Sequence, residues 1–487
     1  MVELLDKTNA KGELGMKTFQ MIINGEEVGN ELPVIEVSNP ATGDVFATVP
    51  KGGKDEAASA VDAAYAAFTS WSSLSAYERS EYLWKWHDLI RENAEDLATT
   101  MTEEQGKPLS EALGEIKYAN GFISWYAEEG KRIYGETIPA TQQNKRILIQ
   151  KQPVGVTAVI TPWNFPAAMI TRKVGPALAA GCTVVIKPAG QTPLTAIKLV
   201  QLAVEAGIPK GVINVITGQS KEIGEAWLED TRVRKITFTG STEVGRGLMK
   251  GAAATIKKIS LELGGHAPVI VMDDCDLDKA VAGVLAAKFR NAGQTCVCAN
   301  RIYVHESIVK PFTEKLVEKA KELKVGNGLD EGVDIGPLID ASAIEKVQQH
   351  VDDAKEKGAT IELGGTNPKG LYFEPTVLSN VTDDMICMQE ETFGPVTPIS
   401  TFATEEEAIR RANDSIYGLA AYVFTENISN GIRITEQLEY GIIGLNDGLP
   451  STPQAPFGGL KQSGLGREGG HQGMDEYLEV KYVSLGL

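Results

Sequence analysis

The sequence is poor in cysteine and histidine, and the few that it has are scattered. Its 487 residues include five cysteines, an odd number that is too small for a disulfide framework in a chain of this length. There are only five histidines, and no H-E-x-x-H or paired C-x-x-C motif occurs, so we expect no metal site. Reduced cysteines and an N-terminus without an apolar signal segment predict a cytoplasmic protein.

Positive charge and long apolar runs are also scarce. Lysine and arginine number 47 against 65 acidic residues, which gives a formal net charge of −18. Nucleic acid and anionic membrane surfaces would be repelled, so we expect neither as a partner. No run of about 18 apolar residues is present, so we expect no membrane-spanning helix. An acidic small molecule stays compatible with this charge, because salt screens charges beyond about 8–10 Å and local arginines can dominate.

What the sequence does contain is an alternation of strands and helices, in a chain long enough for two to four domains. The first quarter is expected to be mostly helical, with apolar residues at helical spacing over 54–70 and amphipathic stretches to about residue 130. Short apolar strands then alternate with helices, which predicts parallel sheets covered on both faces. The predicted strands are 156–162, 183–188, 212–218 and 235–241, and then 267–273, 420–426 and 441–447 in a second set. Two further strands, within 145–155 and 475–486, are predicted to form a small separate β element.

One short segment, "FRNAGQTCVCAN" (289–300), contains two of the five cysteines. Cys296 follows a predicted helix in a stretch of small residues, as expected for an accessible loop. A thiol with the ordinary pKa of about 8.5 is a strong nucleophile even when only a few per cent is ionised. From the residues alone, Cys296 and Cys298 are equally well interpreted as small apolar core residues.

Two other residues have chemistry that would complement a nucleophilic thiol. Glu262 lies between leucines in "LELGGHAP" (261–268), where burial would raise its pKa towards the range of a general base. Asn164, in "TPWNFP" (161–166), follows a predicted strand, and its amide is a suitable donor to an oxyanion. An ion-paired glutamate and a turn asparagine are the alternative interpretations.

A glycine-containing turn, "FTGSTEVG" (238–245), places Gly240 and Gly245 between a predicted strand and a predicted helix. It is not a G-x-G-x-x-G motif and is a weak dinucleotide signal by itself. Backbone N–H groups at the start of a helix nevertheless suit a pyrophosphate.

Seven motifs, taken in order, resemble those of the NAD(P)-dependent aldehyde dehydrogenase superfamily over about residues 17–487. They are "TPWNFP", "IKPAG", "FTGSTEVG", "LELGG", "GQTC", "EETFGPV" and "PFGGLKQSGLGREGG". Longer segments, including "FRNAGQTCVCANR" and "GREGGHQGMDEYLEVKY", are most similar to the succinate-semialdehyde dehydrogenase branch. The resemblance implies an α/β fold with two Rossmann-like parallel-sheet domains and a small β arm used for oligomerisation, in a homodimer or homotetramer.

The resemblance also implies the chemistry. Cys296 would attack the aldehyde to form a thiohemiacetal, with its oxyanion held by the Asn164 amide and the Cys296 backbone N–H. Hydride transfer to the nicotinamide would leave a thioester, which water activated by Glu262 would hydrolyse. Members that pass the acyl group to coenzyme A usually lack this base. Glu262 therefore favours a dehydrogenase that hydrolyses its thioester over a coenzyme-A-acylating dehydrogenase or an esterase.

The cofactor site implied by the family lies on several loops. Its residues are Thr161, Pro162, Trp163, Asn164, Lys187, Ala189, Gly190, Gly240, Ser241, Gly245, Leu263, Glu391 and Phe393. Trp163 and Ser241 would lie at the pyrophosphate, Lys187 at the adenosine ribose, and Glu391 at the nicotinamide ribose. Many NAD-preferring members have glutamate in place of Gly190, so we predict that this protein prefers NADP and also accepts NAD.

The substrate implied by the branch is succinate semialdehyde, which is oxidised to succinate. Arg172, Arg290 and Ser451 match the residues that bind its distal carboxylate, a role that suits the planar guanidinium group. A structural ion pair is the alternative for either arginine. Glutarate semialdehyde, 2-oxoglutarate semialdehyde and a broad range of aliphatic aldehydes are alternative substrates, because "LPSTPQA" (449–455) departs from the pattern of the branch.

Two further expectations follow from the resemblance. Cys298 is a candidate redox partner that would form a disulfide with Cys296 under oxidation, although an apolar core role is equally compatible. The chain is expected to divide into a cofactor-binding domain (1–133 and 156–263), a catalytic domain (264–462) and an oligomerisation arm (134–155 and 472–487).

Overall fold

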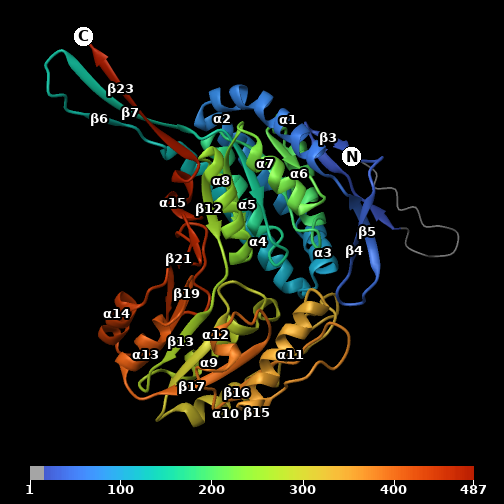
Figure 1. The fold of residues 1–487 in the computed structure, drawn as a ribbon, viewed down its shortest axis with the longest axis vertical. Coiled ribbons are helices and arrows are strands. Elements are labelled where there is room, and N and C mark those ends of the chain that lie inside the picture. The colour runs from blue at the N-terminus through green and yellow to red at the C-terminus, as the bar shows by residue number, and fades with distance from the viewer. Residues whose placement is uncertain (1–15) are drawn as a thin grey trace.

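The fold was analysed in a computed structural model that describes residues 16–487. Residues 1–15, which the sequence analysis assigned to the cofactor-binding domain, lie outside the described residues. Two lobes lie one above the other, and a long β arm projects from the upper lobe (Figure 1). Within residues 16–487, no helix is long and apolar enough to cross a membrane.

The upper lobe is built on an eight-stranded sheet whose central strands are parallel. In spatial order its strands are β22 (Gly464–Leu465), β12 (Lys258–Glu262), β11 (Val233–Thr239), β8 (Val156–Ile160), β9 (Thr183–Lys187), β10 (Ile213–Val215), β2 (Met21–Ile23) and β3 (Glu26–Val28). The outer strands β22, β2 and β3 pair antiparallel with their neighbours.

Helices cover both faces of this sheet, as its near-continuous apolar strands predict. One face carries α1 (Lys54–Ser73) and α7 (Ser220–Glu229), whose buried side chains pack with Val185 of β9. The opposite face carries α2 (Ala76–Glu92), α3 (Ala94–Gln105), α4 (Leu109–Glu129), α5 (Ala168–Ala180) and α6 (Leu194–Glu205), which pack with Val184 and Ile186. The helix α8 (Thr242–Ala252) with η2 (Ala253–Thr255) follows β11, and η1 (Gly130–Arg132) follows α4. The alternation along β9 therefore divides the apolar side chains of the lobe between two cores.

The lower lobe contains a second, seven-stranded sheet, which is parallel except at β15. Its order is β15 (Thr360–Leu363), β16 (Thr376–Ser379), β17 (Val396–Phe402), β14 (Ala299–His305), β13 (Ala267–Val271), β19 (Ala420–Phe424) and β20 (Ile442–Leu445). Its helices are α9 (Leu277–Phe289), η3 (Arg290–Gly293), α10 (Val309–Ala320), α11 (Ala341–Glu356), α12 (Ile386–Gln389), α13 (Glu405–Asn413) and α14 (Ile428–Gln437). A short ribbon of β18 (Tyr417–Gly418) and β21 (Leu460–Lys461) lies beside it.

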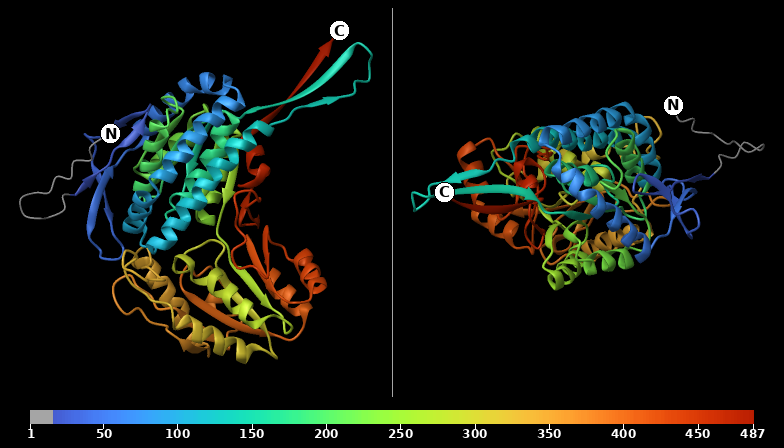
Figure 2. Two further views of the ribbon diagram at one scale, coloured as in Figure 1. Left: turned by 180° about the vertical axis from the view of Figure 1, so that it is seen from behind. Right: turned by 90° about the horizontal axis from the view of Figure 1, so that it is seen from above.

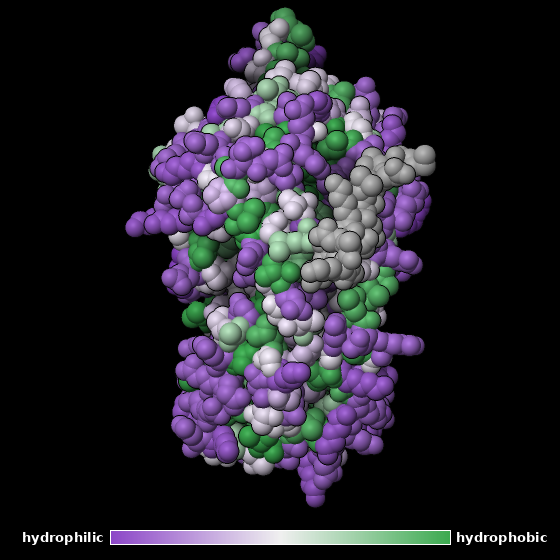
Figure 3. Space-filling view, turned by 90° about the vertical axis from the view of Figure 1, so that its right-hand side faces the viewer, coloured by the Kyte–Doolittle hydropathy of each residue, from purple (hydrophilic) through white to green (hydrophobic). Residues whose placement is uncertain are grey.

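The arm is a three-stranded antiparallel sheet that lies outside both lobes (Figure 2). It consists of β6 (Glu136–Ile138), β7 (Lys145–Pro153) and β23 (Leu478–Gly486), with α15 (Gly470–Asp475) before the last strand. The predicted pairing of 145–155 with 475–486 is therefore confirmed. The face seen in Figure 3 is mainly hydrophilic, and the tip that projects at its top carries hydrophobic groups as well.

The α/β fold with two parallel-sheet lobes agrees with the sequence analysis, but the expectation of a mostly helical first quarter is wrong for residues 17–50. This segment forms β2 and β3 of the large sheet and a separate sheet of β1 (Lys17–Thr18), β4 (Val34–Ser38) and β5 (Val45–Pro50). These strands are short, and β1, β3 and β4 are largely exposed, so they lack a clear apolar pattern. The exact domain boundaries stay a prediction.

Candidate active site

The two sheets are joined directly, and Cys296 lies where they meet. The strand β12 ends at Glu262, and β13 of the second sheet begins at Ala267. A Cβ atom at Gly265 would overlap the Cys296 carbonyl oxygen, so this connection lies directly against the backbone of the cysteine. Glycine at this position permits the close approach of the two backbones.

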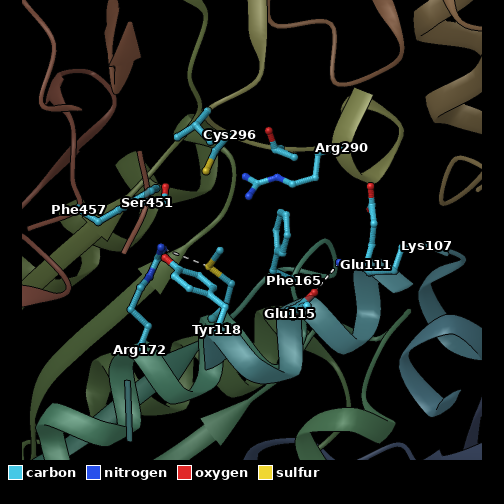
Figure 4. Close-up of a pocket in the computed structure, with 14 residues that line it drawn as sticks. Lys107, Glu111, Glu115, Tyr118, Phe165, Arg172, Arg290, Cys296, Ser451 and Phe457 are labelled. Carbon is cyan, nitrogen blue, oxygen red and sulfur yellow. Dashed lines mark hydrogen bonds and ion pairs between the residues drawn. The ribbon is translucent and has the colours of Figure 1, made fainter. Parts of the chain in front are cut away.

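Cys296 lines a cavity of about 270 Å³ between the lobes. Its walls are formed by Lys107, Glu111, Gly114, Glu115, Tyr118, Phe165, Met169, Arg172, Arg290, Thr295, Cys296, Val297, Ser451 and Phe457. Figure 4 shows the sulfur of Cys296, the guanidinium groups of Arg172 and Arg290, and Ser451 around one space. The predicted nucleophile and the three predicted carboxylate-binding residues are therefore brought together.

The two arginines of the cavity are held differently. Arg172 on α5 is fully buried, forms an ion pair with Glu468, and lies with its guanidinium carbon 4.2 Å from the ring centroid of Phe457. Arg290, at the end of α9, lies over the Phe165 ring at 5.3 Å. The sequence analysis gave a structural ion pair and a substrate-binding role as alternatives for Arg172. In the structure Arg172 forms a buried ion pair and also lines the cavity. Glu468 is shared with Lys173, so it offsets the charge of Arg172 only in part.

The Cys296 thiol is not activated in this structure. Burial raises the pKa of the Cys296 thiol to about 12, although the positive charge of Arg172 acts in the opposite direction. The thiol is therefore protonated at neutral pH and must lose its proton before it can attack.

Glu262 has the environment of a general base. Its side chain is buried at the end of β12, and its Oε2 has no hydrogen-bond partner among residues 16–487. Burial, together with the nearby negative charge of Glu468, raises the pKa of Glu262 well above its usual value. Burial would also raise the pKa of Glu468, but the positive charges of Arg172 and Lys173 hold that pKa below its usual range. Glu262 is therefore the carboxyl group of this pair that takes up a proton more readily.

Asn164 is fixed to the cysteine loop from both ends. Its side-chain amide donates to the Gln294 carbonyl oxygen at 3.0 Å. Its own backbone carbonyl accepts from Lys107 Nζ at 2.8 Å and from Asn291 Nδ2 at 3.0 Å. One amide N–H is engaged by Gln294, which leaves the second N–H available to a substrate oxygen.

Except for Glu391 and Phe393, the predicted cofactor residues lie at or just beyond the carboxyl ends of strands of the first sheet, where ligands bind in such folds. Thr161, Pro162 and Trp163 follow β8, and the buried Thr161 hydroxyl has no hydrogen-bond partner among the described residues. Lys187 ends β9 and donates to Ser220 Oγ at 2.5 Å, and burial lowers the pKa of Lys187 to about 8. Ala189 and Gly190 follow it, and a Cβ at Gly190 would meet no atom within 4 Å.

The turn after β11 begins the helix α8. Ser241 is the N-cap residue and accepts from the Val244 N–H at 3.4 Å. The Gly240 N–H donates to the Glu262 carbonyl at 3.0 Å, so this turn touches the end of β12. The helix α8 packs closely against the end of β12, and a Cβ atom at Gly245 would overlap the Leu263 side chain. Packing therefore explains why glycine stands at this position.

The segment 391–395 approaches the same region from the second lobe. Glu391 Oε1 accepts from the Gly265 N–H at 2.9 Å, and burial raises the pKa of Glu391 to about 7. The Phe393 ring packs edge-on against Trp163 at 5.6 Å between centroids. The open space at Gly190 and the unpartnered Thr161 hydroxyl are compatible with a bound dinucleotide along these loops.

Cys298 does not line the cavity. It is fully buried, and its thiol lies 3.6 Å from the Lys288 carbonyl oxygen. All five cysteines are free. A disulfide between Cys298 and Cys296 stays a prediction, and it would require Cys298 to leave this packed position.

Sequence reasoning missed the buried charged residues behind the cavity. Lys107 and Glu115 form an ion pair with an N–O distance of 2.5 Å, and Glu115 also accepts from the Ala167 N–H at 2.9 Å. Lys173 and Glu468 form another buried ion pair. Lys107 lies before α4 and Glu115 lies within it, and lysine and glutamate are almost always exposed, so the sequence did not indicate that this pair is buried.

Comparison with known proteins agrees with this geometry. The model of the aldehyde dehydrogenase family matches residues 28–483. The chain is 55% identical over 471 residues to succinate-semialdehyde dehydrogenase [NADP(+)] GabD of Escherichia coli (strain K12). The alignment covers 96% of this chain and 98% of that protein. It is 55% identical over 469 residues to glutarate-semialdehyde dehydrogenase of Pseudomonas putida, with the same coverage of 96% and 98%. A crystal structure of an E. coli NADP dependent enzyme aligns with a TM-score of 0.96 at 55% identity, covering 97% of this chain and 98% of that one. The protein therefore belongs to the aldehyde dehydrogenase family.

Proposed function

We propose that the protein oxidises a carboxylate-bearing aldehyde to its acid with NADP or NAD, that succinate semialdehyde is the preferred substrate, and that the product is succinate. The observation that carries the proposal is the shared cavity of Cys296, Arg172, Arg290 and Ser451. A small aldehyde whose far end is anionic fits both the nucleophile and the cationic wall. The relatives named for succinate semialdehyde and glutarate semialdehyde support the same class of substrate.

Arg290 is the principal binding group for the substrate carboxylate in this proposal. The positive charge of Arg172 is already opposed by Glu468, whereas the guanidinium of Arg290 lies over an aromatic ring. A guanidinium can bind a carboxylate through two parallel hydrogen bonds, which fixes the orientation of the substrate. Ser451 supplies a hydroxyl on the same wall.

The first chemical step is attack of the Cys296 sulfur on the aldehyde carbon. The thiol must lose its proton for this step, because burial holds it in the neutral form. The oxyanion that develops is bound by the Asn164 amide and by the Cys296 backbone N–H. Because Asn164 is fixed to Gln294 and Lys107, this donor is in place before the substrate arrives.

When bound, a nicotinamide cofactor accepts the hydride that leaves the aldehyde carbon. Lys187 and Ser220 would hold the adenosine end, and the space at Gly190 would admit a 2′-phosphate that a glutamate would repel. Trp163 and Ser241 would contact the pyrophosphate, and Glu391 and Phe393 would position the nicotinamide riboside. The relative whose name includes NADP(+) supports a preference for NADP.

The last step is hydrolysis of the thioester on Cys296. Glu262 takes a proton from the water that attacks the thioester carbon, and its raised pKa makes it a stronger base than an exposed glutamate. The bond between the acyl carbon and the sulfur then breaks, the carboxylate leaves through the cavity, and the proton held by Glu262 returns to the sulfur and restores the Cys296 thiol.

Glutarate semialdehyde is the second candidate substrate, because one relative is named for it. It has the same two functional groups with one more methylene. 2-Oxoglutarate semialdehyde and unbranched neutral aldehydes remain as further alternatives.

We also propose that the protein is a cytoplasmic homodimer or homotetramer in which the arm contacts a second copy. Val480, Tyr482, Leu485 and Leu487 are exposed on the arm, although such side chains usually pack against a partner. The free state of all five cysteines is compatible with a reducing compartment.

A panel of aldehydes of increasing length, assayed with NAD and with NADP by the absorbance of the reduced nicotinamide, tests the proposal. We expect the highest kcat/KM for succinate semialdehyde with NADP, and much lower values for neutral aldehydes of equal length. Equal or higher values for the neutral aldehydes would contradict the substrate class. A large advantage for NAD would contradict the cofactor preference alone.

A further inference from the structure

The backbone just before Cys296 adopts an unusual conformation. Asn291 and Ala292 have φ angles of 52° and 55°, and Gly293 follows with 75°. The left-handed region is disfavoured for residues with a Cβ atom, because this atom approaches the following carbonyl oxygen. Asn291 and Ala292 therefore require contacts that hold them, whereas Gly293 adopts this conformation without strain. We call residues 291–293 the left-handed turn.

The left-handed turn separates two functional side chains. Arg290 immediately precedes it, and Cys296 follows it by three residues, so its shape sets the position of the cationic group relative to the sulfur. On its inner side, Asn291 Nδ2 donates to the Asn164 carbonyl at 3.0 Å. A change of its backbone would therefore displace the nucleophile, the carboxylate-binding arginine and the oxyanion donor together.

One side chain from the other lobe holds the backbone of this turn. Glu111 lies in the first turn of α4 and lines the cavity. Its Oε2 accepts a hydrogen bond from the Asn291 backbone N–H at 2.8 Å. Gly293, at the end of the turn, packs against the carbonyl oxygen of Gly394, where a Cβ atom would overlap it. The turn is thus clamped between α4 and the segment that follows Phe393.

We propose that Glu111 is a positioning residue, which fixes the spacing between Cys296 and Arg290 by holding the Asn291 N–H. The inference rests on the proposed function of these two residues. Glu111 acts as a hydrogen-bond acceptor in this role, and its negative charge is not required. Nor does it transfer a proton or bind the substrate carboxylate, which its own charge would repel.

Three substitutions separate the hydrogen bond from the charge. Glu111→Gln keeps a carbonyl oxygen at the same reach and removes the charge. Glu111→Asp keeps the charge but is one methylene too short to reach the Asn291 N–H. Glu111→Ala removes both. The matched control is Glu81→Ala, which removes an exposed glutamate of α2 that makes no contact with the cavity.

For succinate semialdehyde, we expect Glu111→Ala and Glu111→Asp to lose about 10- to 100-fold in kcat/KM, as small displacements of reacting groups do. Glu111→Gln should keep the activity within about 5-fold, because a neutral acceptor bonds about half as strongly as a charged one. The losses should be smaller for a neutral aldehyde of equal length, which does not need the Arg290 spacing. Hydrogen–deuterium exchange of peptides spanning 289–299 should rise in the Asp and Ala variants and stay near wild type in the Gln variant.

The opposite order would overturn the inference. If Glu111→Asp keeps activity while Glu111→Gln loses it, the charge matters and the hydrogen bond does not. Wild-type activity and exchange in Glu111→Ala would also overturn it. Absence of aldehyde oxidation in the wild-type protein would instead contradict the proposed function, so the two failures are distinguishable.

Discussion

The side-chain amide of Asn164 donates a 3.0 Å hydrogen bond to the carbonyl oxygen of Gln294, two residues before Cys296. This bond crosses between the loop after β8 and the loop before β14, so it joins the two lobes at the reacting centre. The proposed oxyanion donor, Asn164, and the proposed nucleophile, Cys296, are therefore joined through this bond.

Replacement of this donor should affect the chemistry more than the binding. For Asn164→Ala we expect kcat to fall by about 10²–10³-fold, as for loss of one oxyanion donor. The KM for the cofactor should change little. Steady-state kinetics measure both constants, and circular dichroism checks the fold. A kcat within a few-fold of wild type would show that the oxyanion is bound elsewhere.

Replacement of either arginine should lower kcat/KM for anionic aldehydes, but only replacement of Arg172 should lower the free energy of unfolding. In Arg172→Ala the buried Glu468 loses one of its two partners, and such a loss costs up to about 3–5 kcal/mol. Arg290→Ala should raise the KM for succinate semialdehyde and leave the melting temperature near wild type. Thermal denaturation and kinetics on both variants test this. An equal loss of stability in the two variants would contradict the assignment of Arg290 as the principal binding group.

A carboxylate at position 190 should reverse the cofactor preference. Gly190→Glu would place a negative charge in the open space beside Ala189, where it would repel a 2′-phosphate. We expect kcat/KM for NADP to fall by about 10-fold or more and that for NAD to change little, since an uncompensated like charge costs at least about 1.4 kcal/mol. The ratio of the two specificity constants is the readout, and Gly190→Ala is the control. An unchanged ratio would place the phosphate elsewhere.

The preference for NADP should also depend on pH. Burial lowers the pKa of Lys187 to about 8, so the free site loses its positive charge as the pH rises through this value. A bound 2′-phosphate favours the protonated lysine, so the affinity for NADP should decrease above about pH 8 while that for NAD decreases less. Binding of each cofactor, followed by fluorescence from pH 6.5 to 9.5 or thereabouts, measures this. Parallel curves for the two cofactors would exclude Lys187 as the phosphate partner.

Much of the fold could be predicted because its strands are continuous apolar runs. The runs 183–188 and 267–273 indicate buried parallel strands, and β9 and β13 lie there. The short N-terminal strands were missed for two different reasons. The pairing of β2 with β10, which is almost 200 residues away, leaves no local pattern. The pairing of β3 with β2 is a local hairpin, and its two-residue turn of Asn24 and Gly25, with φ angles of 55° and 71°, is a hairpin signal that the sequence analysis did not use.

For the site, the sequence indicated the residues that we propose to react but not those that hold them. Cys296, Asn164 and Glu262 stand in short motifs. In the structure Cys296 lines the cavity, Asn164 bonds to the loop before Cys296, and Glu262 ends β12 at the junction of the sheets. Glu111 and Lys107 lie in an ordinary charged segment before and within α4, and nothing local shows that they contact the loops of Asn164 and Asn291. The left-handed turn could not be predicted from the sequence either, because alanine rarely adopts a positive φ angle.

The central claim is that Cys296 carries the acyl group and that Glu262 is needed to release it. Glu262→Gln keeps the size of the buried side chain and removes the base, so the steps before hydrolysis should still occur. Rapid mixing of this variant with succinate semialdehyde and NADP, followed by mass spectrometry of the Cys296 peptide, tests the claim directly. We predict a burst of about one reduced cofactor per subunit, slow turnover afterwards, and a succinyl group on Cys296. Sustained turnover at the wild-type rate, or an acyl group on any other residue, would contradict the account.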